Sequence, residues 1–481
     1  MSTRITRDPD GSSGPDRRGS GPRQWPLVTA SLLLCGLAIP VIARGALLAD
    51  DFDNCLRPVD WGLAPTLANS WERLGPVRPA RFLEILLTTG VCQNLPFGVA
   101  IAVPLALTIA VAWLLRALLR DMALPHPWPE VGGIVWLLQP LGTEAALWPA
   151  ALHVPLGLAL GLSAILLHRR GRPLLGSLAA LAAFGSVEQA IFVLPLATAL
   201  LVQPRHRRGA TSLTAGTAVV VLLVYALSPG VDPRLDVGLV ERAFALFAEP
   251  SFYVLYPALG VGAHSIPLAV VWAWPVSVAL LAAAAAAGWL VGPAAPPMPV
   301  VRPSRRQVLT AVALVAALVL LALLPVVTTV PRQGSPRTFA PIWLILAGGA
   351  AFGGPLVRWV PPARAVAGAL AAGAVLSLAF SVAVRLASAD FVEHAAQQLA
   401  ERSADGAVIA VCDVPRTVVE PAPRGSFAVH EFLYEGYARD ALAYHTDRQA
   451  AFRLAGPLWP DRDCPAADEV DLRVHFDELR P

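Results

Sequence analysis

The chain is short of charge. Only 15% of its 481 residues are charged and 56% are hydrophobic, and no lysine occurs, so its side-chain cations are arginine and histidine. A soluble globular chain carries roughly 25% charged residues. The mean hydropathy of +0.58 is correspondingly high. This composition excludes an ordinary water-soluble enzyme and predicts a membrane protein.

Several catalytic and binding motifs are also missing. The sequence has no GxxxxGKS/T phosphate-binding loop, no HExxH zinc motif, no CxxC pair and no dinucleotide-binding glycine pattern after a strand. It also lacks the basic stripe with interleaved aromatic residues that binds nucleic acid. Nucleotide-driven chemistry, zinc chemistry and nucleic-acid partners therefore have no support.

Apolar runs recur at lengths near the ~20 residues that cross a bilayer. The first, Pro26 to Leu48, has no cleavage site after it, so we expect a retained span behind a disordered cytoplasmic tail, 1–24. The runs that begin at 130, 174 and 189 are short, which indicates half-spans inside a bundle. We predict an all-α polytopic domain, 25–386, of about eleven transmembrane or half-spanning helices. They cover 26–48, 96–115, 130–142, 147–167, 174–186, 189–202, 211–228, 266–291, 308–328, 340–357 and 365–386.

Arginine clusters lie in alternate loops between these runs. The positive-inside rule places the clusters and the N-terminus in the cytoplasm, so the loop 49–95 and everything after 386 are extracytoplasmic. We expect a multi-pass protein of the cell membrane. The clusters are Arg116 and Arg120; His168, Arg169, Arg170 and Arg172; Arg205, Arg207 and Arg208; Arg302, Arg305 and Arg306; Arg358 and Arg364.

The segment 387–481 differs from the rest of the chain. It holds 17 acidic residues against nine arginines, a formal balance of −8. Strand-like Ala407–Cys412 and helix-like Asp390–Arg402 predict a small folded α/β domain outside the membrane. Cys412 and Cys464 share this segment, and Cys55 and Cys92 share the loop 49–95. An oxidising compartment allows both disulfides, and free thiols are the alternative.

Three acids follow the first span directly. Asp50, Asp51 and Asp53 lie at its outer mouth, where partial loss of hydration raises the pKa of a carboxyl group. Such a group suits a general base that takes a proton from a sugar hydroxyl. Solvated loop acids and a helix cap are the alternative.

Some arginines in the predicted outer loops oppose the positive-inside trend, and two of them are candidate phosphate contacts. Arg337 precedes a late span, and Arg78 lies in a loop segment with the pattern of helices on the membrane surface. A guanidinium group binds phosphate through two parallel hydrogen bonds. A salt bridge to the acidic tail is the alternative for Arg337, and snorkelling to the interface is the alternative for Arg78.

Further ionisable groups lie at outer turns. Glu144 and His153 flank the return helix after Pro140, and Glu188 lies between two short apolar runs. Ionisable residues within a bundle are usually functional. A hydrogen-bonded packing role for His153 and a helix cap for Glu188 are the alternatives.

Taken in order, these features resemble the GT-C superfamily of integral membrane glycosyltransferases, which use polyprenyl-phosphate-linked sugars. The resemblance rests on the acids after the first span, the Arg78-Pro79 loop, the hairpin Gln139 to Trp148, Glu188 between half-spans, and Arg337 before a late span. It covers most of 26–386, and the tail is outside it.

The resemblance implies a mechanism. Asp51, or Asp50, removes a proton from the acceptor hydroxyl, and Arg337 and Arg78 contact the lipid phosphate. Asp53, Glu144, His153 and Glu188 are secondary candidates. The implied partners are the lipid-linked donor and a glycan or lipid acceptor, and part of the family uses a divalent cation.

Two other functions are open at this point. Broken helices at 130–142 and 174–202 are also typical of secondary transporters, although no internal repeat relates the two halves. A non-enzymatic scaffold with a partner-binding acidic tail is the third reading.

Overall fold

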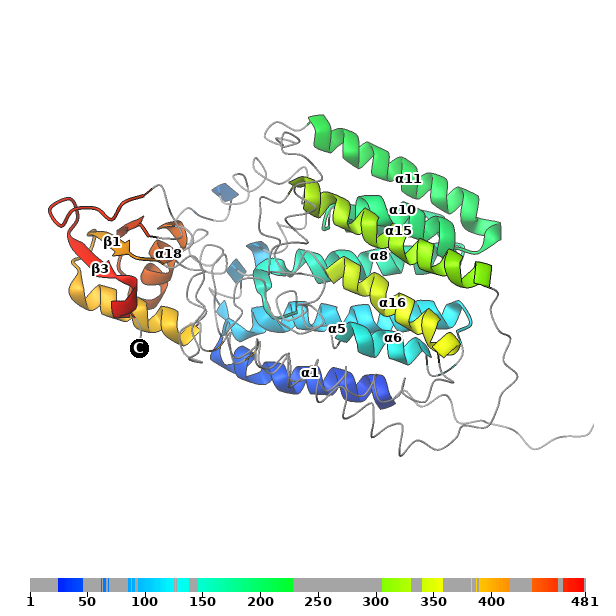
Figure 1. Ribbon diagram of the computed structural model, residues 1–481, viewed down its shortest axis with the longest axis horizontal. Helices are drawn as coiled ribbons and strands as arrows, with labels where there is room; N and C mark the ends of the chain where they lie inside the picture. Colours follow the sequence, from blue (N-terminus) through cyan, green and yellow to red (C-terminus); the bar gives the residue numbers. More distant parts are fainter. Residues whose placement is uncertain are drawn as a thin grey trace, which may run out of the picture.

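The computed structural model describes residues 25–45, 94–124, 128–137, 146–187, 189–227, 305–329, 340–357, 389–414, 435–456 and 462–479, with a few isolated positions between them. In this part of the chain a layered set of helices occupies one end of the molecule and a small α/β domain the other (Figure 1). We call the second the tail domain, residues 389–479. The end of the helical region beside it is the tail-side end, and the opposite end is the far end.

Nine of the eleven predicted apolar segments coincide with helices, and 266–291 and 365–386 lie outside the described residues apart from Val382 and Leu386. Within the described ranges, three helical stretches are long and apolar enough to cross a membrane: Pro26–Arg44, Gly98–Asp121 and Pro149–Arg169. The elements are α1 (Trp25–Arg44), α5 (Gly98–Asp121), α6 (Trp128–Leu137), η1 (Pro149–Ala151), α8 (His153–Arg169), α9 (Pro173–Phe184), α10 (Gln189–Leu201), α11 (Pro204–Leu227), α15 (Arg305–Thr329) and α16 (Ala340–Val357).

The helices α1 and α5 pack closely and run in opposite directions. A Cβ atom at Gly98 would lie 1.9 Å from the carbonyl oxygen of Ile42, so only glycine permits this approach. Gly45, which follows α1, has φ +62° and lies beside Phe97 and Gly98. The end of α1 and the start of α5 therefore meet at the tail-side end.

The short helix α6 is held inside the bundle by two indole groups. Trp136 donates to the carbonyl oxygen of Thr108 in α5 (2.8 Å), and Trp343 of α16 donates to that of Val135 (2.9 Å). A ten-residue helix spans about 15 Å, half the hydrocarbon thickness. The described part of α6 packs against α5 and α16, which enclose its backbone as expected for a short helix inside a bundle.

A buried ion pair closes the far end between α5 and α6. The carboxylate of Glu130 accepts from Arg116 Nε (3.0 Å) and lies 3.2 Å from Arg120 Nη2. His126 Nδ1 lies 3.3 Å from the second oxygen of Glu130. The sequence placed both arginines in a loop, which is wrong: they lie in the last turns of α5. Pairing with Glu130 favours continuation of the helix past Leu115, with Arg116 buried and Arg120 partly exposed.

A second ionic contact joins three more helix ends. Arg169, at the end of α8, forms an ion pair with Asp121 and donates to the carbonyl oxygens of Asp121 (2.8 Å) and Leu201. The ends of α5, α8 and α10 therefore converge at the far end. Arg205, Arg207 and Arg208 were also expected in a loop, but α11 begins before them, because Pro204 supplies a favourable first helical residue.

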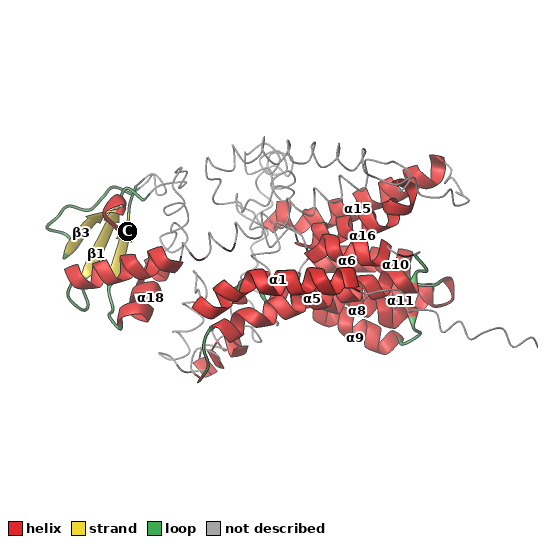
Figure 2. Ribbon diagram, turned by 90° about the horizontal axis from the view of Figure 1, so that it is seen from below, coloured by secondary structure: helices red, strands yellow, loops and turns green. Residues whose placement is uncertain are grey.

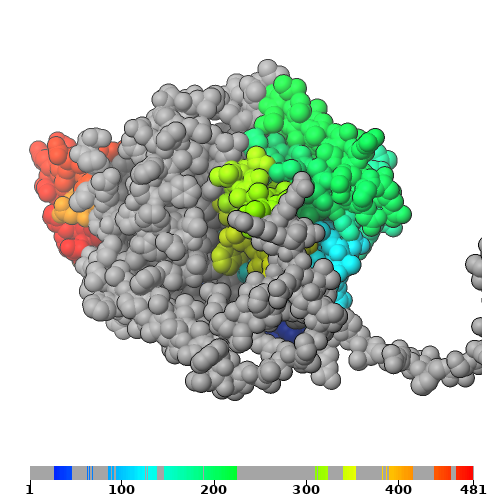
Figure 3. All heavy atoms as spheres, turned by 45° about the vertical axis from the view of Figure 1, so that its right-hand side comes forward, coloured from blue at the N-terminus to red at the C-terminus, as the bar shows by residue number. Residues whose placement is uncertain are grey.

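Large apolar side chains cover the outside of the helical region. Helices α11 and α15, green and yellow-green in Figure 3, reach the surface in this view, and both pack against α10. A surface of this kind marks contact with lipid or protein rather than with water. Among the described residues, the large apolar side chains that are more than half exposed are Leu32, Ile39, Leu95, Leu174, Leu178, Val219, Val220, Leu223, Leu309, Val312 and Leu320.

The tail domain is a three-stranded parallel sheet with two helices. A helix over 389–402 precedes β1 (Val408–Cys412), and α18 (Glu435–Thr446) precedes β2 (Ala451–Leu454). β3 (Leu472–His475) and the short helix η3 (Phe476–Leu479) end the described chain, and the strand order is β2-β1-β3. The expected strand and helix are both confirmed. The Cys412–Cys464 disulfide is also confirmed, with Cα atoms 5.5 Å apart; Cys55 and Cys92 lie outside the described residues.

The buried ion pair at the far end predicts a large loss of stability when one partner is removed. Glu130→Gln leaves Arg116 and Arg120 without their counter-charge, and we expect it to lower the free energy of unfolding by about 3–5 kcal/mol. Equilibrium unfolding in mixed micelles measures the change. The control is Glu469→Gln, whose partner Arg453 is 3.9 Å away in an exposed pair, and which should cost at most about 1 kcal/mol. Equal losses in both variants would contradict a structural role for Glu130.

Candidate functional site at the tail-side end

The predicted site residues fall mostly outside the described residues. Asp50, Asp51, Asp53, Arg78, Glu144, Glu188 and Arg337 all do so, and the structure leaves their mutual distances open. His153 is described: it is the first residue of α8, and it is 8% exposed. It follows the turn Pro149–Ala151, which contacts α5. His153 therefore lies at the tail-side end, the end at which the predicted acids leave α1.

One arginine attaches the tail domain to the helical region. Arg44, the last residue of α1, donates from Nε to Asp390 Oδ1 (3.2 Å) and forms an ion pair with Glu393. Asp390 and Glu393 are three residues apart in the helix over 389–402, so both carboxylates lie on one helix face. Figure 2 shows the tail domain beyond this end of α1. The contact joins the tail domain to the end of the first apolar helix.

A histidine lies beside this junction. Burial lowers the pKa of the His445 imidazole, at the end of α18, below its ordinary value, while nearby Glu393 raises it and Arg44 lowers it. Burial is the largest of these effects, since it disfavours the charged form. At neutral pH His445 is therefore uncharged next to an ion pair.

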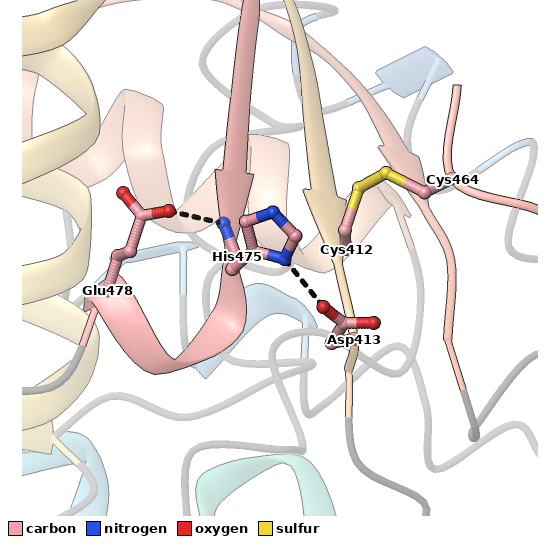
Figure 4. Close-up of a disulfide and its surroundings, with 5 residues drawn as sticks. All are labelled: Cys412, Asp413, Cys464, His475 and Glu478. Carbon is pink, nitrogen blue, oxygen red and sulfur yellow. Dashed lines mark hydrogen bonds and ion pairs between the residues drawn. A yellow bond between two sulfur atoms is a disulfide. The ribbon is translucent and has the colours of Figure 1, made fainter. Parts of the chain in front are cut away.

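An imidazole–carboxylate pair lies at the carboxyl edge of the tail sheet. β1 and β3 are parallel neighbours in which Cys412 is opposite His475, and Asp413 follows β1 directly. His475 Nδ1 lies 2.5 Å from Asp413 Oδ2, as Figure 4 shows beside the disulfide. The backbone N–H of His475 donates to the Glu478 carboxylate (3.1 Å). This hydrogen bond, together with one from Arg402, holds the pKa of Glu478 below its usual range. We call Asp413 and His475 the carboxyl-edge pair.

The backbone around Asp413 is held by two hydrogen bonds to one residue. The N–H of Ala455 donates to Val411 (3.1 Å), and its carbonyl oxygen accepts from Val414 (3.0 Å). Asp413 lies between these bonds with φ +56°, a left-handed conformation that aspartate tolerates better than most residues. Gly456 has φ +127°, and a Cβ atom there would lie 2.5 Å from the nitrogen of Val414. The end of β2 therefore fixes the position of Asp413.

The carboxyl-edge pair lies on the side of the tail domain that faces the helical region. Phe391, between the two residues that contact Arg44, stacks on Phe476 with ring centroids 5.8 Å apart. Phe476 follows His475 directly in the chain. The carboxyl end of β3 therefore lies near the first turn of the helix over 389–402, which contacts Arg44 of α1.

Three of these features were not predicted from the sequence. Arg44 lies at the end of an apolar run on the side opposite the arginine clusters, and that placement was the available signal. The spacing of Asp390 and Glu393 was a second signal. The pairing of Asp413 with His475 spans 62 residues, and no sequence pattern indicates it.

Comparison with known proteins identifies no relative. No family model, curated protein or solved structure matches the chain. Within the described ranges, no three His, Cys, Asp or Glu side chains gather so as to hold a metal ion.

Acidification should loosen the tail domain through His445. Its pKa is lower in the folded state than the ordinary ~6.5, so the unfolded state binds more protons and stability falls as the pH drops through that value. The stabilisation is fully present above it. Hydrogen exchange of the α18 amides, corrected for intrinsic rates, should show faster opening at pH 5 than at pH 7.5. His445→Gln should remove most of this dependence, and an unchanged pH profile in the variant would contradict the assignment.

Gly456 should be needed for the placement of Asp413. In Gly456→Ala the new Cβ meets the backbone of Val414, which cannot move aside cheaply, at an unfavourable φ. We expect a loss of roughly 1–3 kcal/mol in tail-domain stability. Gly406→Ala is the control, because its φ is +79° but nothing lies within 4 Å of its Cβ position. Hydrogen exchange of the β1 and β2 amides compares the stability of the two variants. Equal losses would show that the positive φ, and not the clash with Val414, determines the cost of the substitution.

Proposed function

We propose that the chain is an integral membrane glycosyltransferase. It moves a sugar from a polyprenyl-phosphate donor to an acceptor on the extracytoplasmic side, with Asp51, or Asp50, as general base. The observation that supports this most is the contact between Arg44 and the tail-domain acids, Asp390 and Glu393. It brings a soluble domain to the end of α1 from which the acids follow. Asp51 is six residues beyond Gly45, so an extended chain keeps it within about 22 Å of that end.

The arrangement of the helix ends supports the proposed sidedness. Arg116, Arg120 and Arg169 lie together at the far end, near the first turns of α11 with their three arginines. Arginine-rich helix ends lie on the cytoplasmic side of membrane proteins. In this proposal the tail-side end and the tail domain are extracytoplasmic, and the remaining spans bring the total to about eleven.

The proposed site lies where nucleotide sugars are absent, so a lipid must carry the donor. The Asp51 carboxylate takes the proton of the acceptor hydroxyl as its oxygen attacks the anomeric carbon. The bond from that carbon to the phosphate oxygen breaks, configuration inverts, and the lipid phosphate leaves with the bonding electrons. A partly dehydrated carboxylate is a stronger base than one in water, which favours this step.

Positive charge is needed where the phosphate leaves. In the proposal Arg337 contacts it and Arg78 lies near the headgroup, because preorganised donors stabilise charge that develops in the transition state. Asp53, Glu144, His153 and Glu188 are secondary candidates for orienting acceptor or donor. A divalent cation that spans the phosphate would add to the same stabilisation.

A secondary transporter is the second candidate. The short helices α6, α9 and α10, of 10, 12 and 13 residues, favour it, because broken helices line transporter substrate sites. Flux of labelled sugar across proteoliposomes, without covalent transfer, would support the transporter over the transferase.

Single substitutions at the acids test the proposed base. We expect Asp51→Asn, or Asp50→Asn if that residue is the base, to lower the rate of lipid-linked sugar consumption by about 100- to 10,000-fold. The purified full-length protein in nanodiscs is assayed with a polyprenyl-phosphate sugar and an envelope glycan extract. Asp60→Asn is the matched control from the same loop and should retain the wild-type rate.

Full activity in all of Asp50→Asn, Asp51→Asn and Asp53→Asn would refute an Asp base after the first span. A weaker affinity of Arg337→Gln for polyprenyl phosphate would support the contact between Arg337 and the phosphate. Unchanged affinity in that variant would assign Arg337 to another role.

A further inference from the structure

The carboxyl-edge pair lies at the point where the strand order of the tail sheet reverses. β1 is central, the chain passes from it to β2 on one side, and β3 returns on the other side. Open parallel sheets bind ligands outside the carboxyl ends of their strands, and here β1 leads toward α18 and β2 while β3 leads into η3. Asp413 and His475 occupy the two carboxyl ends concerned (Figure 4).

The pair presents hydrogen-bond acceptors to solvent. In the neutral tautomer of His475 that donates its Nδ1 proton to Asp413, Nε2 carries a lone pair and accepts. Among the described residues, neither Nε2 nor Asp413 Oδ1 has another partner, and the two side chains are 49% and 68% exposed. The left-handed backbone of Asp413, held by Ala455, keeps the carboxylate in place. Two adjacent, fixed acceptors match adjacent hydroxyl donors.

The charge around the pair selects against anions. Asp413, Asp477 and Glu478 lie at or next to it, and the segment 387–481 has a formal balance of −8. A phosphate or carboxylate would meet like charge here. A neutral ligand with several hydroxyl groups is the chemical class that fits, and a carbohydrate is such a ligand.

We infer that the carboxyl-edge pair binds the hydroxyl groups of a neutral glycan and presents it to the tail-side end of the bundle. The pair is level with the turn that binds Arg44, beyond which the acids of the first outer loop follow. The identification of this glycan as the acceptor depends on the proposed transferase function. The binding itself does not, because it needs neither the donor nor the acids of the loop.

Glycan binding without turnover tests the inference. The full-length protein in nanodiscs is applied to an array of neutral oligosaccharides from mannan, glucan, galactan and arabinan, with no lipid donor present. We expect wild-type protein to retain at least one of them. Asp413→Asn and His475→Phe should each weaken that binding about tenfold or more, since the first replaces an acceptor oxygen with an NH2 donor and the second removes the Nε2 acceptor. Glu469→Gln removes the same charge as Asp413→Asn near the opposite edge of the sheet, and should bind within about twofold of wild type.

Folding and function are separated by two further measurements. Each variant must keep the Cys412–Cys464 disulfide in non-reducing mass mapping and the wild-type hydrogen exchange of β1. With the retained glycan as acceptor, we expect a raised KM and a nearly unchanged kcat in both variants.

The possible results distinguish this inference from the proposed function. No neutral-glycan binding by wild type, or unchanged binding in both folded variants, overturns the carboxyl-edge site whether or not transfer occurs. Binding that is lost in the variants, in a protein that transfers no sugar, supports the site and refutes the transferase.

Discussion

A carboxylate enclosed by two guanidinium groups is the constraint on which the helical region depends. Glu130 is buried, and its contacts with Arg116, Arg120 and His126 offset the cost of that burial. Once this pair is formed, α5 must extend to the far end and α6 must begin there. The opposite end of α5 then lies against the end of α1, so the tail domain, attached through Arg44, is separated from the arginine-rich ends by the length of the bundle.

The two ends of the helical region differ in the physical character of their contacts. The far end uses buried ion pairs, which are costly to break and therefore hold helices in register. The tail-side end uses Arg44 with partly exposed partners, and such pairs contribute little to stability. The Arg44 contact therefore orients the tail domain more than it stabilises it. The stability of the tail domain comes from its sheet, its disulfide and the stacking of Phe391 on Phe476.

Sequence alone predicted the features that depend on local pattern. Apolar runs located nine helices, and the strand β1, the helix over 389–402 and the Cys412–Cys464 bond were also anticipated. The sequence analysis misplaced the C-terminal end of α5 and the start of α11. It took charged residues to end a helix, whereas partners elsewhere in the structure allow the helix to continue through them. It could not pair Arg44 with Glu393, 349 residues away, because hydropathy and charge order contain no contact information.

If the chain is a lipid-dependent transferase, its loop acids and its late outer arginine must share one cavity. A structure of the full-length protein in nanodiscs with bound polyprenyl phosphate measures this most directly. We predict the phosphate within hydrogen-bond distance of Arg337, and the carboxylate of Asp51 or Asp50 facing it across a space large enough for one sugar. A phosphate bound elsewhere, with these residues widely separated, would contradict the proposed function.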